Sequence, residues 1–411
     1  MKSLEQRIEA HIDELAQYTE TPNHGVTRVV YTEQDTLAKE YMKKQMEELG
    51  LKIEEDEIGN LFGTWKGTDR KLPQVWTGSH LDAPTHGGKF DGVVGVFGSL
   101  EAIRILQQEN FKPKHDIILV VFVAEEPTRF GIGCLGSRAL TGMIVPADLE
   151  SWKDKDHISL KEVLLQNGRN PEKVLSEELA PEKIKNFIEL HVEQGAVLET
   201  EQKEIGIVDD IAAPTDIQLI IHGEQRHAGS TPMSIRKDPM PAAAEVILLV
   251  EKLTKNNISE TSVGTVGKMV ITPGASNVIP EQVELTIDIR DVDANKKKRI
   301  ITELSKEITT ILDERDLSYQ FSIKSDDVPS RMNEEVVQFI KKSCEEVGCS
   351  AKVMASGAYH DALIMSRRVP ANMIFVPSQN GISHAPTEFT ATAEIATGIK
   401  VLARTLEKLS K

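Results

Sequence analysis

Histidines and carboxylates gather in short loops of this 411-residue chain, most of them after a segment that has the apolar pattern of a strand. Open α/β sheets place their sites at the ends of strands, so these loops are where chemistry is expected. Five loops qualify when residues 90–92 are counted with the first. They lie at residues 78–82 with 90–92, 124–127, 191–195, 359–361 and 383–386.

The residue types in these loops favour a metal centre. Imidazoles and carboxylates without thiolates suit Zn²⁺, Mn²⁺, Co²⁺ or Ni²⁺, and the choice among these ions stays open. Two ions about 3.5–4 Å apart need a carboxylate that binds both, and a hydrolase of this kind also needs a base for the attacking water. Glu125 and Glu126 are neighbours at the end of a strand, where successive side chains point in different directions. One can therefore serve as the base and the other as a ligand.

Each of these residues also has a purely structural interpretation. A single histidine is more often a packed or solvated residue than a ligand, and adjacent glutamates are usually a solvated surface pair. Here, however, Glu125 and Glu126 follow the apolar run 117–123. Two unpaired carboxylates at the end of a buried strand are costly without a cation, so the functional interpretation is favoured.

The order of predicted elements indicates two domains of the α/β class. The first half of the chain alternates helices and strands, as expected of a mainly parallel sheet with helices on both faces. From about residue 211 the order becomes βαββαβ over roughly 115 residues, which is typical of a compact ferredoxin-like domain. We therefore expect a metal-binding catalytic domain formed by residues 1–211 and 326–411, and an inserted domain formed by residues 212–325.

Composition narrows the class of protein. The 48 basic and 64 acidic residues give a net charge of −16, which argues against nucleic acids and anionic membranes as partners. No run approaches the roughly 18 apolar residues of a membrane span, and the capped helical pattern after Ser3 argues against a secretion signal. Cys134, Cys344 and Cys349 cannot form a disulfide framework, so we expect a cytoplasmic protein in which Cys344 fills the core.

Five sequence motifs resemble one known family. They are GSHLD at residues 78–82, FDGVVGV at 90–96, EEPTRFG at 125–131, ELHVEQG at 189–195 and HAG at 227–229. With these motifs the chain resembles the M20 metallopeptidase clan. Within the clan it is similar to the branch of N-carbamoyl-L-amino acid hydrolases, allantoate amidohydrolases and ureidoglycolate amidohydrolases. The resemblance runs from residues 25–28 to the last predicted helix.

The resemblance implies a role for each residue of the centre. Two divalent metal ions are expected per subunit, Zn²⁺ or Mn²⁺, with Co²⁺ or Ni²⁺ as alternatives. Glu125 is implied as the general base, and Asp82 as a carboxylate that holds the ligand geometry. The implied metal ligands are His80 and His191 for one ion, Glu126 and His384 for the other, and Asp91 as the bridge.

The resemblance also implies how substrate is bound. The inserted domain of the family grips the substrate carboxylate, and the matching residues are Asn277 and Arg290. His227 is implied to stabilise the oxyanion and to reach into the active site of a second copy, which would make the protein a homodimer. The structural alternatives are a solvated strand residue for Arg290 and a turn residue for His227. Further substrate contacts are implied for Gln194, Gly357, Ala358 and His360.

The activity implied by this branch is hydrolysis of the terminal amide of a small ureido acid, with release of ammonia and CO₂. Residues 125–137, 211–214 and 358–361 favour ureidoglycolate, whereas residues 226–233 are closer to enzymes that use N-carbamoyl-L-amino acids. Allantoate is the third alternative. A dipeptidase or N-acyl amino acid deacylase is less favoured, because those branches usually have a carboxylate where this chain has His191. A relative without catalysis would lack the base, and Glu125 is present.

Overall fold

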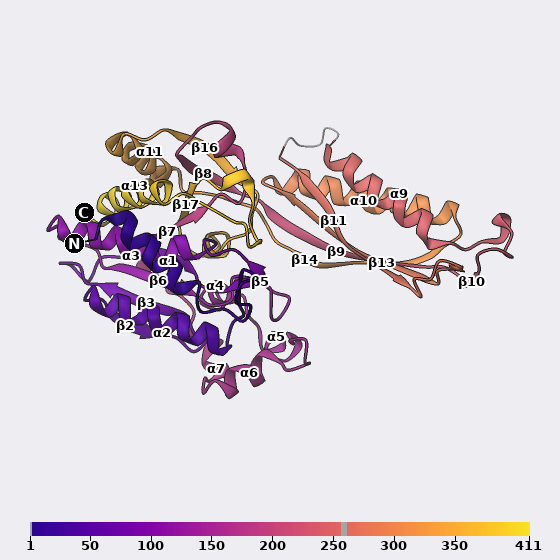
Figure 1. Cartoon of the computed structure of the whole chain (residues 1–411), viewed down its shortest axis with the longest axis horizontal. Coiled ribbons are helices and arrows are strands. Elements are labelled where there is room, and N and C mark those ends of the chain that lie inside the picture. Colours follow the sequence, from indigo (N-terminus) through magenta and orange to yellow (C-terminus); the bar gives the residue numbers. More distant parts are fainter. Residues whose placement is uncertain (1, 256–260) are drawn as a thin grey trace. The chain divides into compact units, whose positions relative to one another are not determined.

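The computed structural model describes residues 2–255 and 261–411, which form two compact units (Figure 1). Unit 1 contains the residues up to Asp209 together with Met332–Met354 and His360–Lys411. Unit 2 contains Asp210–Arg331 and Ala355–Tyr359. Each unit has a sheet of its own.

The sheet of unit 1 is built on four parallel strands. Strands β17, β7, β4 and β6 are neighbours in that order and run in the same direction. Antiparallel strands β8, on one side, and β3 and β2, on the other, extend this sheet. The strand bounds are β2 Lys52–Glu55, β3 Leu61–Trp65, β4 Gln74–His80, β6 Ile117–Phe122, β7 Ile184–Val192, β8 Ile205–Ile211 and β17 Ala371–Val376. The predicted α/β class with a parallel-strand sheet is confirmed, and antiparallel strands flank the parallel centre, so the sheet as a whole is mixed.

Helices lie on both faces of this sheet. Leu190 of β7 packs against α3 and α13, whereas the next residue, His191, contacts the ring of His360 just before α12. Because successive strand residues point to opposite faces, α12 lies across the sheet from α3 and α13. The helix bounds are α1 Leu4–Leu15, α2 Glu33–Glu48, α3 Val93–Gln108, α4 Leu135–Leu140, α5 Pro146–Ser151, α6 Leu160–Gln166, α7 Pro171–Val174, α8 Val197–Thr200, α11 Glu334–Val347, α12 Asp361–Met365 and α13 Thr392–Ser410.

Unit 2 is a four-stranded antiparallel sheet with two helices. The strands lie in the order β11, β13, β9 and β14, and the order along the chain is β9-α9-β11-β13-α10-β14. This is the βαββαβ order that the sequence predicts. The bounds are β9 Ala213–His222, α9 Pro239–Lys255, β11 Val263–Thr272, β13 Gln282–Asp291, α10 Ala294–Glu314 and β14 Ser318–Asp326. The short strands β10 Arg226–His227 and β12 Val278–Ile279 pair with each other.

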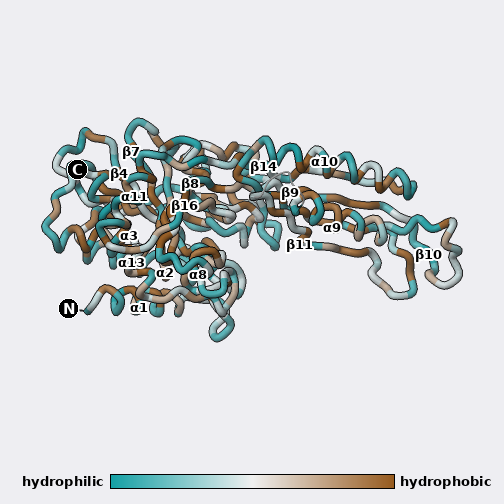
Figure 2. Tube along the Cα trace, turned by 90° about the horizontal axis from the view of Figure 1, so that it is seen from above, coloured by the Kyte–Doolittle hydropathy of each residue, from teal (hydrophilic) through white to brown (hydrophobic). Residues whose placement is uncertain are grey.

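The core of unit 2 follows from the periodicity of its elements. Strand β13 alternates buried and half-buried residues along its whole length, as a strand with one covered face does. Helix α10 carries one buried stripe, so its hydropathy alternates along the helix in Figure 2. The residues of that stripe are Ile300, Leu304, Ile308 and Leu312, and all four are fully buried in one cluster with the strand residues.

The observed unit boundaries lie a few residues from the expected ones. Strand β15, Ser330–Arg331, pairs with Ile211 and Asp210, so unit 2 extends to Arg331. Residues 355–359 also belong to unit 2, since the Gly357 carbonyl accepts a hydrogen bond from Arg290. The assignment of unit 2 as a lid and dimerisation domain stays a prediction.

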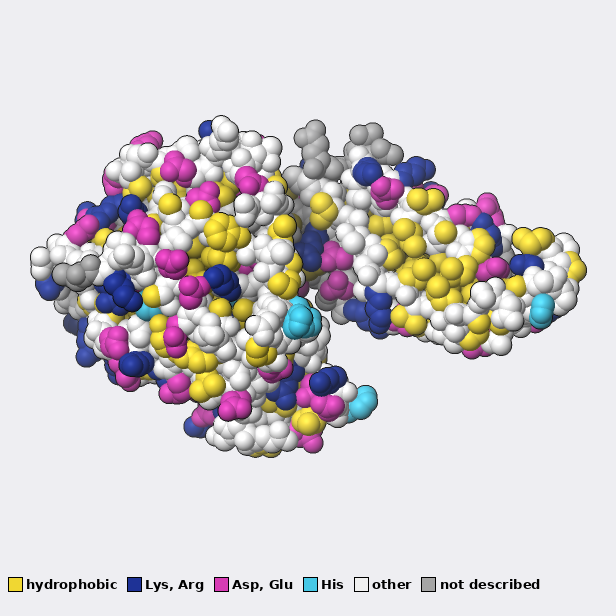
Figure 3. Space-filling view, viewed as in Figure 1, with side chains coloured by type: hydrophobic (Ala, Val, Ile, Leu, Met, Phe, Trp, Pro, Cys, Tyr) yellow, Lys and Arg dark blue, Asp and Glu magenta, His cyan; other side chains and the backbone are white. Residues whose placement is uncertain are grey.

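Acidic and basic side chains are intermingled on the face of unit 1 that Figure 3 shows. Among residues 2–255 and 261–411, no helix is long and apolar enough to span a bilayer.

Candidate metal centre

The expected ligands converge at one edge of the unit 1 sheet. His80 is the last residue of β4, His191 is the penultimate residue of β7, and Glu125 and Glu126 follow β6. These three strands are parallel neighbours, so their carboxyl ends meet at the same edge. Asp91 lies just before α3, which starts at the same edge. The prediction that chemistry gathers at the strand ends thus has a direct structural basis.

Asp91 lies between two groups of side chains. Its Oδ1 atom is 3.1 Å from Nε2 of His191 and 3.6 Å from Nε2 of His80. Its Oδ2 atom is 3.0 Å from Nε2 of His384, which is in turn 3.3 Å from Oε1 of Glu126. In each group the ligand atoms lie within 4.8 Å of one another, and Asp91 is the member that the two groups share.

The side chains around Asp91 fit a divalent cation. Among the described residues, Nε2 of His80 and Oε1 of Glu126 are buried atoms without a hydrogen-bond partner, which is costly unless a cation binds them. Nδ1 of His80 donates to the Asp82 carbonyl at 3.1 Å, and Nδ1 of His191 donates to the Val192 carbonyl at 2.9 Å. These bonds hold a proton on Nδ1 of each ring, so Nε2, which faces Asp91, is the atom that can bind a cation, as in metal-binding histidines.

The pKa shifts of the groups around Asp91 indicate that the centre concentrates negative charge. Burial raises the pKa of Glu125 well above its usual value, and Glu126 adds to this effect although His80 opposes it. Burial, followed by the charge of Asp91, raises the pKa of Glu126 to about 7. Hydrogen bonding to Asp91 raises the pKa of His384 to about 9. Buried acids that lack sufficient positive charge respond in this way, and divalent cations supply such charge.

Asp82 holds the loop that carries both glutamates. Its Oδ1 accepts a hydrogen bond from the Glu125 amide at 3.1 Å, and its Oδ2 accepts one from the Glu126 amide at 2.9 Å. The same loop turns through Ala124, which adopts a left-handed φ of 50°. Asp82 is the carboxylate expected to hold the ligand geometry. In the structure its carboxylate accepts from these two amides, its Oδ1 is also 3.5 Å from Nδ1 of His80, and its backbone carbonyl accepts from that Nδ1.

Gly92 provides the close approach between the Asp91 loop and His80. Its φ is 63°, and a Cβ atom at this position would lie 2.5 Å from Cε1 of the His80 ring. The Gly92 amide also donates to Nε2 of His191 at 3.2 Å. Any larger residue would therefore push the loop away from both imidazoles.

Two of the expected substrate-binding residues lie against the expected ligands. The side-chain amide of Gln194 donates through Nε2 to Oδ2 of Asp91 at 2.8 Å. The backbone of Gln194 has a left-handed φ of 58°. His360 is fully buried, and its ring centre is 4.5 Å from that of His191. Gln194 and His360 thus each contact an expected metal ligand, so a substrate that they touch would lie next to the metal centre.

Two further buried residues, Arg28 and Glu189, hold the segments next to the expected ligands, and the sequence alone does not identify them. The guanidinium of Arg28 is fully buried and donates to the carbonyls of Leu81 at 2.6 Å and Leu15 at 2.8 Å, which holds the chain just after His80. Glu189 accepts hydrogen bonds from the Ser79 hydroxyl at 2.7 Å and from an amide of α12. Glu189 lies in the ELHVEQG motif and Arg28 in the segment 25–28 where the resemblance begins, but neither stretch of sequence shows that the partner comes from a distant segment.

The residues of unit 2 that are expected to bind substrate or stabilise the oxyanion lie at opposite ends of β13. Arg290 donates to both carboxylate oxygens of Asp288 and, at 3.2 Å, to the Gly357 carbonyl, next to Ala358. His227 lies on β10, and the amide of the next residue donates to the Asn277 carbonyl at 2.9 Å. Asn277 belongs to the connection between β11 and β13, at the end opposite Arg290. One copy of unit 2 therefore does not bring Asn277 and Arg290 to the same small ligand.

His227 is exposed and has a defined tautomer. Its Nδ1 accepts hydrogen bonds from the amides of Gly229 at 3.0 Å and Ser230 at 3.2 Å. Because an amide cannot accept, Nδ1 carries the lone pair and a neutral ring carries its proton on Nε2. His227 thus presents an N–H donor away from its own turn, as an oxyanion-stabilising residue must.

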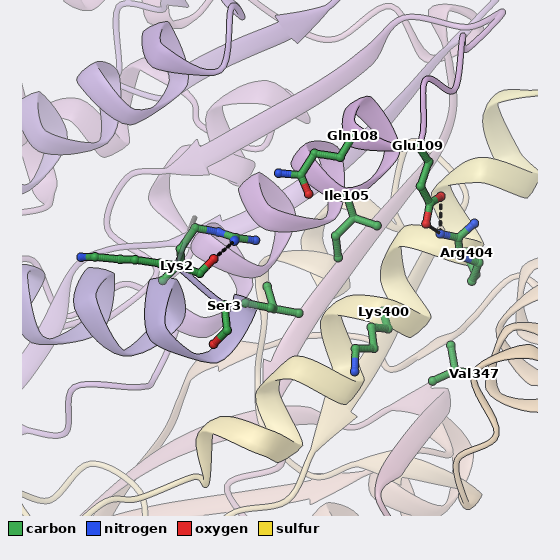
Figure 4. A pocket seen from close by; sticks show the side chains of 10 residues that line it. Lys2, Ser3, Ile105, Gln108, Glu109, Val347, Lys400 and Arg404 are labelled. Atoms are coloured by element: carbon green, nitrogen blue, oxygen red, sulfur yellow. Dashed lines mark hydrogen bonds and ion pairs between the residues drawn. The ribbon is translucent and has the colours of Figure 1, made fainter.

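A cavity of about 540 Å³ in unit 1 lies away from this centre (Figure 4). It is lined by residues near the start of α1, by residues in or next to α3, and by residues of α11 and α13, none of which is an expected ligand. Its arginines are already paired: Arg404 contacts Glu109, and Arg7 contacts Glu101. The cavity is therefore not part of the expected metal centre.

Comparison with known proteins decides the family. The model of peptidase family M20/M25/M40 matches residues 75–408, which contain all the expected ligands. The chain belongs to this family. The M20 resemblance drawn from the motifs is therefore confirmed, and the chain is a hydrolase that acts on C–N bonds.

The M20 relatives are similar to this chain over nearly its whole length. A ureidoglycolate hydrolase from Arabidopsis thaliana is 41% identical and covers 98% of this chain and 86% of its own length. An N-carbamoyl-L-amino-acid amidohydrolase from Pseudomonas sp. (strain NS671) is 38% identical, with 98% of both chains covered. The crystal structure of AtUAH in complex with glyoxylate superposes with a TM-score of 0.91 at 40% identity, covering 99% of this chain and 97% of the other.

Proposed function

We propose that this protein hydrolyses the terminal amide of a small ureido acid, with ureidoglycolate as the favoured substrate. The observation that carries the proposal is the placement of Asp91 between two ligand groups, because a shared carboxylate is what a two-cation hydrolase needs. The substrate class rests on the relatives, whose names include ureidoglycolate and N-carbamoyl-L-amino acid hydrolases.

The proposed cofactors are two divalent cations per chain, Zn²⁺ or Mn²⁺, with Co²⁺ or Ni²⁺ as alternatives. His80 and His191 would hold one cation, Glu126 and His384 the other, and Asp91 both. When bound, such cations polarise the substrate carbonyl and make water easier to deprotonate. A donor set of imidazoles and carboxylates without thiolate fits these metals.

Glu125 is proposed as the group that moves the proton. It takes a proton from the water that adds to the ureido carbonyl carbon, and it gives a proton to the nitrogen that leaves as ammonia when the C–N bond breaks. The remaining carbamate loses CO₂. Two features support this role: burial raises the affinity of Glu125 for a proton by raising its pKa, and Asp82 fixes its backbone.

The substrate-binding role of unit 2 is proposed to need two copies. Arg290 would bind the substrate carboxylate, and Asn277 and His227, which lie together at the other end of β13, would serve the site of the partner chain. The edge strand β11 supports pairing, since it exposes Val263, Met269 and Val270. Figure 3 shows hydrophobic side chains gathered on the visible face of unit 2.

N-carbamoyl-L-amino acids are the second candidate substrates, because residues 226–233 are closer to the enzymes that use them. Allantoate ranks third. Dipeptides and N-acyl amino acids rank below these, because His191 occupies a position where those branches usually have a carboxylate.

The test is ammonia release from a panel of ureidoglycolate, allantoate, N-carbamoyl amino acids and dipeptides, after loading with Mn²⁺ or Zn²⁺. Dipeptide cleavage is followed separately by release of a free amino acid. The proposal expects the highest kcat/KM on ureidoglycolate and no activity after chelation. Preference for dipeptides over every ureido acid would overturn the substrate class, and Glu125→Gln serves as the matched inactive control.

A further inference from the structure

One buried carboxylate outside the expected ligand set joins two of the ligand loops. Glu388 follows His384 by four residues and is 5% exposed. Its Oε1 accepts hydrogen bonds from the backbone amides of Phe90 and Asp91, each at 3.0 Å. Its Oε2 accepts one from the hydroxyl of Ser383 at 2.7 Å. Both oxygens of Glu388 are thus used.

These bonds connect segments that are almost 300 residues apart in the sequence. Asp91 is the residue that the two ligand groups share, and Ser383 precedes His384 directly. The backbone of His384 has a left-handed φ of 55°, so its loop needs support to keep that conformation. The ring of Phe90 also meets that of Phe389 edge to face at 5.6 Å, which gives the two loops a second contact.

The packing at Gly88 shows how little the two loops can shift. A Cβ atom on Gly88 would lie 2.2 Å from Oε1 of Glu388 and 2.4 Å from its Cβ. The backbone of the Asp91 loop therefore rests directly on the Glu388 side chain. A carboxylate that accepts from two backbone amides in a buried place forms strong hydrogen bonds, so it defines the position of the loop.

We propose that Glu388 is a positioning residue that sets the separation of Asp91 and His384 and thereby the affinity for the cation held by Asp91, Glu126 and His384. The inference rests on the proposed function, in that these three residues are taken as ligands. Glu388 acts most on this cation because His80 and His191 are held by β4 and β7, whereas His384 lies in a loop. Residues that orient metal ligands typically change affinity by about 10–100-fold when they are removed.

The test compares Glu388→Ala, Glu388→Gln and a matched control. The control is Glu162→Ala: Glu162 also accepts from a backbone amide and a serine hydroxyl, both of Ser159 at 2.8 Å, but it lies on α6 among residues that are not ligands. Metal-free protein is titrated with Mn²⁺ in competition with a chelator, and amide hydrogen exchange at Phe90 and Asp91 is measured before metal is added.

Glu388→Ala is expected to weaken one of the two binding steps by at least about tenfold and to speed exchange at Phe90 and Asp91. Glu388→Gln should stay within about threefold of the wild type, because its amide oxygen still accepts from both backbone amides and its NH₂ group donates to Ser383. Glu162→Ala should change neither measurement.

Unchanged metal affinity and unchanged exchange in folded Glu388→Ala would overturn the inference, as would equal weakening of both binding steps. If Glu388→Ala does not fold, Ser383→Ala is measured instead, because it removes one of the three hydrogen bonds of Glu388. Unchanged metal affinity in both binding steps of that variant would count against the role. Exchange is read without metal and binding without substrate. A failure of the proposed ureido hydrolysis would therefore leave these results intact, and a wild type that binds no cation would refute the proposed cofactors separately.

Discussion

The carboxylate of Asp82 accepts a hydrogen bond from the backbone amide of Glu126 at 2.9 Å, and its other oxygen accepts from the amide of Glu125. The chain that leaves β4 thus holds the loop that leaves β6, although 43 residues separate Asp82 from Glu125. The expected base and an expected ligand are fixed by one side chain.

Replacing Asp82 by Asn should disturb this loop, because an amide NH₂ group would face one of the two backbone N–H donors. A buried donor left without a partner costs about 1–3 kcal/mol, and supports of this type change activity by about 10–100-fold. We therefore expect kcat to fall by a factor in that range while the variant stays folded, as measured by ammonia release and circular dichroism. Normal kcat would show that the loop keeps its conformation without Asp82.

Replacing Glu125 by Gln keeps its size but removes its ability to take a proton. We expect kcat to fall by at least about a hundredfold while metal content is retained, since loss of a general base usually costs that much. Kinetics together with elemental analysis of the purified variant check both parts. Near-normal turnover would remove Glu125 from the mechanism.

His227 is expected to act on the active site of the partner chain. Mixing inactive Glu125→Gln with inactive His227→Ala under conditions of subunit exchange should restore activity, because a two-fold dimer shares residues reciprocally. Random mixing makes half of the dimers mixed, with one working site in each, so recovery should approach about a quarter of the wild-type rate. No recovery, with exchange shown by a tagged chain, would mean that His227 does not act across the dimer.

Glu101 should make stability depend on acid pH. It is fully buried and accepts hydrogen bonds from Arg7 at 2.7 Å and Arg104 at 2.9 Å. Burial alone opposes ionisation, but His11 and the two arginines outweigh it and lower the pKa of Glu101 from 4.5 to about 2. A lowered folded-state pKa stabilises the protein above about pH 4.5, and this contribution is lost as the pH falls towards 2.

The measurement for Glu101 is chemical denaturation of the wild type and Glu101→Gln at several pH values. The shift corresponds to about 3 kcal/mol of free energy of unfolding at neutral pH, and to roughly 1–1.5 kcal/mol less at about pH 3.5. The stability difference between the two proteins should narrow accordingly. A difference that does not change between pH 7 and pH 3.5 would contradict the role of ionised Glu101.

The sequence predicts most of the fold because local patterns define its elements. The apolar run that becomes β6 and the stripe of α10 appear directly in the residue order, and parallel strands then bring their carboxyl ends together. The family resemblance implies Asp91 as the residue between two sets of ligands. The structure adds the geometry, with one carboxylate oxygen directed at each set.

The contacts that sequence could not predict all join distant segments. Arg28 reaches the Leu81 carbonyl, Gln194 reaches Asp91, and Glu388 reaches the amides of the Asp91 loop. No periodicity reports such pairs, because they depend on how strands and loops pack in three dimensions. The backbone carbonyl of Gly357 likewise joins Arg290 in unit 2, although the sequence places residue 357 in the larger domain.

Asp91 is the residue on which the proposed two-cation centre depends most, because both ligand groups contain it. The direct measurement is elemental analysis of metal bound per chain after loading wild type and Asp91→Ala with Mn²⁺ or Zn²⁺ and removing free metal. Wild type should retain two ions per chain, and Asp91→Ala should lose both, because each ligand group loses a member. Two ions still bound to folded Asp91→Ala would contradict the shared carboxylate, and with it the two-cation centre as described.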